Sequence, residues 1–226
     1  MCGIIGSFSK EKLSELLDLN ASRGQFSHSL TTIDPDTLEC NPLQKFGKFD
    51  KDLLRHVRDG KYMLAHIQAP TGGLIHDQSR IHPATIKKYL LWHNGILKNK
   101  EIQRLNTKYS TNIQWDTKLL LHSISRSGII PTLKELDGAF ACVLIEEYKS
   151  FKIFRNQTSP LYIGDNLDIS SVEFEGSKML PMNYVYNSNF KDKCFERRKP
   201  FLNQNTPYFF TDDEKGVLNG ELRRNT

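Results

Sequence analysis

The chain has 226 residues, of which 38% are hydrophobic and 25% are charged, and its formal net charge is +5 at pH 7. This length and composition predict one soluble globular domain with a peripheral extension, and they exclude a disordered chain. No apolar run approaches the roughly 18 residues of a membrane-spanning helix, and the modest basic excess, crowded near the end of the chain, argues against direct nucleic-acid binding.

The first half of the chain predicts short strands and one early helix. Residues 2–8 predict a buried strand, and Ser9 then caps a helix that carries its leucines on one face. Residues 22–24 predict a loop, and residues 62–66 and 89–92 predict strands that end in turns.

The second half predicts one helix followed mostly by strands. Asp116 or Thr117 lies at or near the cap of a helix whose apolar positions run to Ile124. Short strands separated by turn residues are then predicted at residues 138–145, 151–154, 161–164 and 169–174. This order of elements predicts an α+β fold with layered sheets.

The ends of the chain and its cysteines exclude further classes of protein. The opening MCGIIGSFS has neither the basic region nor the apolar stretch of a secretory signal, which predicts a cytoplasmic location. The four cysteines are scattered without a CxxC pair, and the histidines do not cluster in the sequence. We therefore expect no disulfide framework, no metal site and no cofactor.

Cysteine at position 2 is the first candidate catalytic residue. Removal of Met1 would leave Cys2 with a free α-amine beside its own thiol. An α-amine has a pKa of about 7.7–8.0 and a thiol one of about 8.5, so this amine can take the thiol proton without a distant histidine. The alternative is that Cys2 is only a small buried apolar residue of an N-terminal strand.

The segment His93-Asn94-Gly95 is the second candidate. It directly follows the predicted strand at residues 89–92 and offers a side-chain amide next to a glycine N–H. Two such donors at a strand end suit the oxyanion that forms when a thiolate attacks an amide. Asn-Gly is also the commonest hairpin turn, and that alternative stays open here.

Several motifs in one order carry a family resemblance. They are the opening MCGIIGSFS, Arg23-Gly24, residues 66–73, His93-Asn94-Gly95, Trp115-Asp116-Thr117, residues 136–140, and Arg155 with Ser159-Pro160-Leu161. Together they resemble the class II glutamine amidotransferases, the glutaminase domains of asparagine synthetase, glucosamine-6-phosphate synthase and amidophosphoribosyltransferase. The match predicts an amidotransferase core at residues 1–175 and a C-terminal extension at residues 176–226 that packs on or docks beside it.

The resemblance implies a four-layer αββα fold of the N-terminal-nucleophile hydrolases, with glutamine as substrate. Cys2 would form a thioester, its α-amine would act as base and then as acid, and Asn94 and Gly95 would stabilise the oxyanion. Asp116 would pair with the substrate α-ammonium, and the residues around Thr71 would line its α-carboxylate. A plain helix cap is the alternative role of Asp116.

Three positions depart from the family pattern. Most members have arginine where this chain has Gln68. That arginine binds the substrate α-carboxylate through a charge-assisted bidentate hydrogen bond. Its loss weakens glutamine binding by one to two orders of magnitude unless Arg23 or Arg80 compensates. Phe26 stands where an aspartate is usual, and Gly72 stands where histidine or alanine is common.

Ammonia released by such a site needs an acceptor. Residues 176–226 are too few for a synthase domain, so we expect a separate synthase or amidotransfer subunit that docks over the active site, with these residues as docking element or lid. The small divergent form also resembles amidotransferases of large bacteriophages, in which nucleotide or base modification would take the nitrogen in the host cytoplasm.

Two other functions remain open at this stage. Gln68 favours an N-terminal-nucleophile amidohydrolase that acts on another amide. A catalytically silent regulatory subunit could also keep the same fold.

Overall fold

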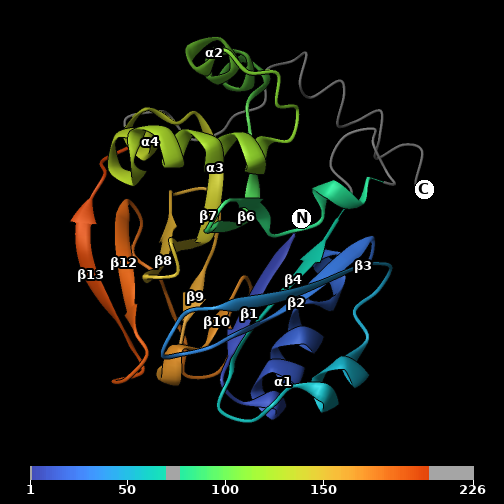
Figure 1. Cartoon of the computed structure of the whole chain (residues 1–226). Helices are drawn as coiled ribbons and strands as arrows, with labels where there is room; N and C mark the ends of the chain where they lie inside the picture. The colour runs from blue at the N-terminus through green and yellow to red at the C-terminus, as the bar shows by residue number, and fades with distance from the viewer. Residues whose placement is uncertain (1, 70–76, 204–226) are drawn as a thin grey trace.

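The computed structural model describes residues 2–69 and 77–203, which fold into two stacked antiparallel sheets between helices (Figure 1). The helices of these residues are α1 (Lys10–Asn20), α2 (Asn99–Tyr109), α3 (Asp116–Ser127) and α4 (Ile129–Glu135), with short 3₁₀ helices at Ala21–Arg23, Lys51–His56, Gln78–Arg80 and Asp165–Leu167. No helix within these ranges is long and apolar enough to cross a membrane.

The seven-stranded sheet has the order β11 (Lys178–Met179), β9 (Tyr162–Ile163), β10 (Ile169–Ser170), β1 (Gly3–Ser7), β4 (Tyr62–Gln68), β2 (Ser27–Ile33) and β3 (Cys40–Phe46). The six-stranded sheet has the order β13 (Cys194–Pro200), β12 (Tyr184–Asn189), β8 (Ser150–Arg155), β7 (Gly138–Glu146), β6 (Tyr89–Leu97) and β5 (Ala84–Ile86). With α1 on one side and α3 and α4 on the other (Figure 1), the predicted four-layer αββα architecture is confirmed.

The alternation of side chains along β4 shows why the layers stack. Tyr62 and Leu64 point into the core between the two sheets, whereas Met63 and Ala65 join the leucines of α1 in a separate cluster. Because β4 is buried on both faces, its sequence is apolar from Tyr62 to Ala65 rather than alternating, and its two polar residues, His66 and Gln68, are buried as well. The same logic places Leu119 and Leu120 of α3 against the outer face of the six-stranded sheet.

Ser9 caps α1 as predicted. Its side-chain oxygen accepts a hydrogen bond from the backbone N–H of Lys12 at 3.0 Å. We expect Ser9→Ala to lower the free energy of unfolding by about 1 kcal/mol, measured by urea denaturation. Ser22→Ala, at an exposed position outside α1, is the matched control, and an equal loss in both variants would contradict the capping role.

The predicted turn at Asn94-Gly95 is wrong. β6 continues through both residues to Leu97, and Asn94 pairs with Ala141 of β7 while Gly95 pairs with Phe140. Cross-strand pairing therefore overrides the local turn preference of this dipeptide.

The described part of the extension belongs to the sheets. Residues 178–179 form β11 of the first sheet, and residues 184–200 form β12 and the edge strand β13 of the second. Residue 175 is thus not a boundary of either sheet. The remaining stretch, residues 204–226, lies outside the described residues.

Candidate active site

Cys2 lies directly before the first residue of β1, beside the last residues of β4. Gly3 pairs with Ile67, so the antiparallel register sets Cys2 opposite Gln68, and strand alternation directs both side chains toward the second sheet. Cys2 is buried, with 7% of its surface exposed. The Cys2 carbonyl accepts a hydrogen bond from Nε of Arg23 at 2.8 Å.

The surroundings of the Cys2 thiol act on its pKa in opposite directions. Burial raises the pKa of this thiol above its ordinary value, and the negative charge of Asp116 acts in the same direction. The backbone N–H of Ala69 and the charge of Arg23 lower it. Because the net shift is upward, the thiol needs a base in contact with it before it can attack.

Hydrogen bonds through Ser171 link Asn94 to β1. Its Nδ2 donates to Oγ of Ser171 at 3.2 Å, and that oxygen also accepts from the backbone N–H of Ile4 at 3.0 Å. The N–H of Ser171 in turn donates to the Ile4 carbonyl at 3.0 Å. Asn94 is therefore tied to β1 at the second residue after Cys2, so the structure brings these two predicted catalytic residues into one region.

Gly95 occupies a position that a side chain cannot fill. Its φ is 153°, and a Cβ there would lie 2.0 Å from the carbonyl oxygen of Ala139 and 2.7 Å from Nε2 of His93. The close approach of β6 to β7 thus requires glycine here.

Asp116 is the first residue of α3. Its Oδ1 accepts from the backbone N–H of Thr117 at 2.7 Å, and its Oδ2 accepts from that of Leu97 at 3.3 Å. The Asp116 side chain keeps 20% of its surface exposed, and Oδ2 lies 3.9 Å from Nδ1 of His93. The carboxylate is therefore fixed between the helix start and the end of β6, in electrostatic reach of Cys2.

The Arg23-Gly24 loop packs directly on the end of β4. A Cβ on Gly24 would lie 2.4 Å from the carbonyl carbon of Gln68, and the N–H of Phe26 donates to the Gln68 carbonyl at 3.0 Å.

Two arginines were considered as substitutes for the family arginine. Arg23 donates to the Cys2 carbonyl, whereas Arg80 forms an ion pair with Asp77 at 3.4 Å. Thr71 and Gly72 lie outside the described residues.

Gln68 is held by polar side chains that sequence reasoning missed. Its Oε1 accepts from Oγ of Ser27 at 3.1 Å and lies 3.3 Å from Nδ1 of His82. His82 in turn contacts Thr117 at 3.1 Å. The only signal in the sequence is polar residues inside otherwise buried segments, and their mutual distances depend on how the two sheets stack.

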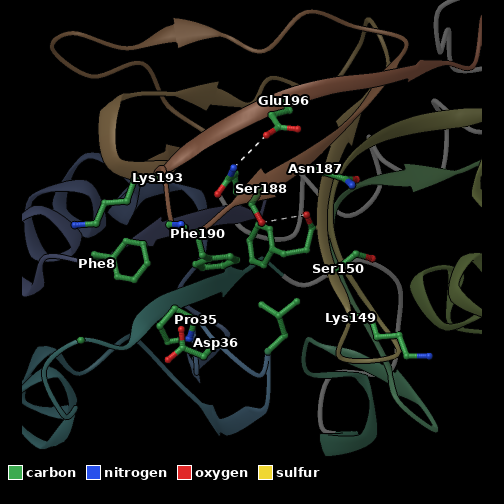
Figure 2. Close-up of a pocket in the computed structure, with 15 residues that line it drawn as sticks. Phe8, Pro35, Asp36, Lys149, Ser150, Asn187, Ser188, Phe190, Lys193 and Glu196 are labelled. Atoms are coloured by element: carbon green, nitrogen blue, oxygen red, sulfur yellow. Dashed lines mark hydrogen bonds between the residues drawn. The ribbon is translucent and has the colours of Figure 1, made fainter.

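A cavity of about 720 Å³ lies elsewhere (Figure 2). Figure 2 shows Phe8 and Phe190 among its lining residues, with Lys149 and Lys193 on opposite sides of the view. Phe8 follows the end of β1, whereas Cys2 precedes its start, so the length of the strand separates this cavity from Cys2. The predicted catalytic residues do not line it.

Several known proteins are similar to this chain. A family model described as a glutamine amidotransferase domain matches residues 74–177. The glutamine–fructose-6-phosphate aminotransferases of Idiomarina loihiensis and Zymomonas mobilis are 25% and 29% identical over 82% and 73% of this chain. The chain spans only 34% and 30% of the length of these two relatives.

Solved structures show the same fold. The glutamine phosphoribosylpyrophosphate amidotransferase from B. subtilis, in complex with ADP and GMP, superposes with a TM-score of 0.68 at 20% identity, over 90% of this chain and 50% of that one. A second structure, of the allosteric regulatory enzyme of purine biosynthesis, has a TM-score of 0.66 over 91% of this chain and 50% of that one. The motif order, the fold and the family match together show that the chain carries a class II glutamine amidotransferase domain.

Proposed function

We propose that this chain hydrolyses the side-chain amide of glutamine through a thioester on Cys2 and supplies ammonia to a separate synthase partner. The observation that carries the proposal is the convergence of Cys2 and Asn94, from different sheets, on the strand end that β1 shares with β4. The relatives that share the domain are named for transferring an amino group from glutamine.

The chemistry begins with the thiol proton. After removal of Met1, the α-amine of Cys2 takes this proton, and sulfur bonds to the amide carbon while the oxygen becomes an oxyanion. The Asn94 amide and the Gly95 N–H donate to that oxygen. When the oxyanion collapses, the carbon–nitrogen bond breaks and the ammonium proton of Cys2 leaves with ammonia. Water then cleaves the thioester, which releases glutamate and restores the thiol.

The substrate is held by its α-substituents. Asp116 pairs with the α-ammonium, because its carboxylate is fixed by backbone donors yet remains partly exposed. Gln68 lies opposite Cys2 and, with Arg23 and the segment around Thr71, takes the α-carboxylate side.

Ammonia must reach an acceptor before it escapes into water, where it is protonated and loses its nucleophilic lone pair. The partner that takes it carries the synthase chemistry. Residues 176–226 supply its docking surface. Nucleotide or base modification is the pathway that we propose for the nitrogen.

Intact-mass measurement after labelling tests the nucleophile. We expect the purified protein to lack Met1 and to gain one equivalent of a thiol-directed glutamine analogue at Cys2. Cys194, which is exposed on β13, is the internal control, because ordinary thiol accessibility would favour it over the buried Cys2.

The outcome separates the proposal from its two alternatives. Label at Cys194 but not at Cys2, with Met1 retained, would contradict the proposal and support a silent regulatory subunit. A free Cys2 amine that resists the glutamine analogue but reacts with another amide-derived electrophile would support a different amidohydrolase.

A further inference from the structure

Asn20, the last residue of α1, carries an unpaired oxygen close to the start of β1. Its side chain is fully buried, and its Nδ2 donates to the Leu16 carbonyl and to Oγ of Ser170, both at 2.8 Å. Its Oδ1 has no hydrogen-bond partner among the residues that the structure describes. Because an unpaired buried acceptor destabilises a fold, this oxygen calls for a donor.

The partners of Asn20 fix the orientation of its amide. A backbone carbonyl only accepts, so the end of the amide that faces Leu16 must be the NH₂ group. Oγ of Ser170 accepts from the same NH₂ group and from the backbone N–H of Val172 at 3.0 Å. Turning the amide over would set Oδ1 against the Leu16 carbonyl. Oδ1 is therefore the end that stays unpaired.

This oxygen lies at the first residue of β1. A Cβ on Gly3 would lie 3.2 Å from Oδ1 of Asn20. Because consecutive Cα atoms are about 3.8 Å apart, Oδ1 lies within about one residue's length of Cys2. The 3₁₀ helix that follows Asn20 contacts Cys2 itself, since Nε of Arg23 donates to the Cys2 carbonyl at 2.8 Å. Residues 20–23 thus contact both Cys2 and Gly3.

Removal of Met1 creates the donor that Asn20 lacks. While Met1 is attached, the Cys2 nitrogen is a peptide N–H. After removal it is an α-amine, which can turn about the Cα–C bond of Cys2 and offers several N–H groups. When this amine is protonated at a buried strand end, it needs hydrogen-bond acceptors. Oδ1 of Asn20 is a buried acceptor that is still unused.

We propose that Asn20 is a positioning residue for the α-amine of Cys2, with Oδ1 accepting one N–H of that amine once Met1 is removed. This inference rests on the proposed function, in which the amine is the base for the thiol. The hydrogen bond would hold the nitrogen so that its lone pair meets the thiol proton. Because a charged donor binds an oxygen more strongly than a neutral one, it also favours the ammonium form.

Other titratable groups face this end of β1 from the neighbouring elements. They are the Cys2 thiol itself, Arg23 after α1, Asp116 of α3, His66 of β4 and His93 of β6. Asp18 of α1 forms an ion pair with Lys51 at 2.6 Å. The substitutions below leave these groups in place, apart from the thiol, which is absent from every protein compared. A difference between variants therefore reports on Asn20.

Titration of the N-terminal amine in trimmed Cys2→Ala protein tests this inference without glutamine hydrolysis. After labelling with ¹³C-alanine, the methyl signal from position 2 is the one that the unmodified protein lacks, and its chemical shift follows protonation of the amine. Asn20→Leu, made in this background, removes the acceptor that favours the ammonium. We therefore expect the titration midpoint to fall by about one pH unit, a typical effect of one hydrogen bond to a charged group.

Two further variants make the result specific. Ser170→Ala removes the other side-chain partner of Asn20 but keeps Oδ1, so the midpoint should stay unchanged. Asn20→Asp keeps an acceptor and adds a negative charge, so the midpoint should rise. An unchanged midpoint in Asn20→Leu, an equal fall in Ser170→Ala, or no rise in Asn20→Asp would overturn this inference alone. The expected shifts in a chain whose Cys2 hydrolyses no glutamine would support the hydrogen bond and overturn the proposed function instead.

Discussion

Replacing Cys2 with alanine is expected to abolish glutamine hydrolysis by the trimmed protein, a loss on the order of 10⁴-fold or more in kcat. The reason is chemical, because alanine keeps the α-amine but has no sulfur to form the thioester. The measurement is glutamate and ammonia release under saturating glutamine, with the partner subunit present if the isolated chain is slow. The variant should still fold, since it loses only one buried sulfur atom.

Cys194→Ala is the matched control for this loss. It removes a thiol from an exposed position on β13, away from β1 and β4, and should leave the rate unchanged. Equal rates in Cys2→Ala and the unmodified protein would refute the thioester route. Equal silence of both, even beside the partner, would favour a regulatory role for the domain.

The short motifs around the candidate site could be identified from the sequence, because each depends on residues close together in the chain. Ser9 caps α1 as predicted, and Asp116 begins α3 within one residue of its expected place. The αββα architecture followed from the family resemblance rather than from hydrophobic periodicity, which left the layered topology undecided.

Other elements had no clear local signal. β3 exposes most of its residues, and β2 mixes serine, threonine and histidine into a buried strand, so neither shows the alternation that marks a half-buried strand. Helix α2 buries little beyond Glu101 and Leu105. Strands β12 and β13 were not predicted either, because their polar residues resemble those of a loop.

The contacts that assemble the site could not be predicted from the sequence either. Ser171 lies 77 positions from Asn94 in the chain, and His82 lies 35 from Thr117. Such pairs meet only because two sheets stack in one register. A one-residue slip of β4 against β1 would turn Gln68 away from Cys2 and direct its side chain toward α1.

Asn94→Ala is expected to lower kcat by about 10²–10³-fold, which corresponds to about 2.7–4 kcal/mol of transition-state stabilisation, with little change in KM. The oxyanion exists only after sulfur attacks, so its donor matters for the rate more than for binding. Steady-state kinetics on glutamine measure this split between kcat and KM. A rise in KM with unchanged kcat would place Asn94 in substrate binding instead.

Ser171→Ala separates a direct role of Asn94 from a structural one. The Asn94 amide donates to Ser171, which also accepts from the N–H of Ile4, so the loss of this hydroxyl should cost about 1–3 kcal/mol of unfolding free energy. It leaves the Asn94 amide in place, however, and kcat should stay within about tenfold of the unmodified protein. If Ser171→Ala slowed hydrolysis as much as Asn94→Ala, Asn94 would act by joining β6 to β1 rather than by donating to the oxyanion. A large loss confined to Asn94→Ala would identify the amide itself as the group that meets the developing charge.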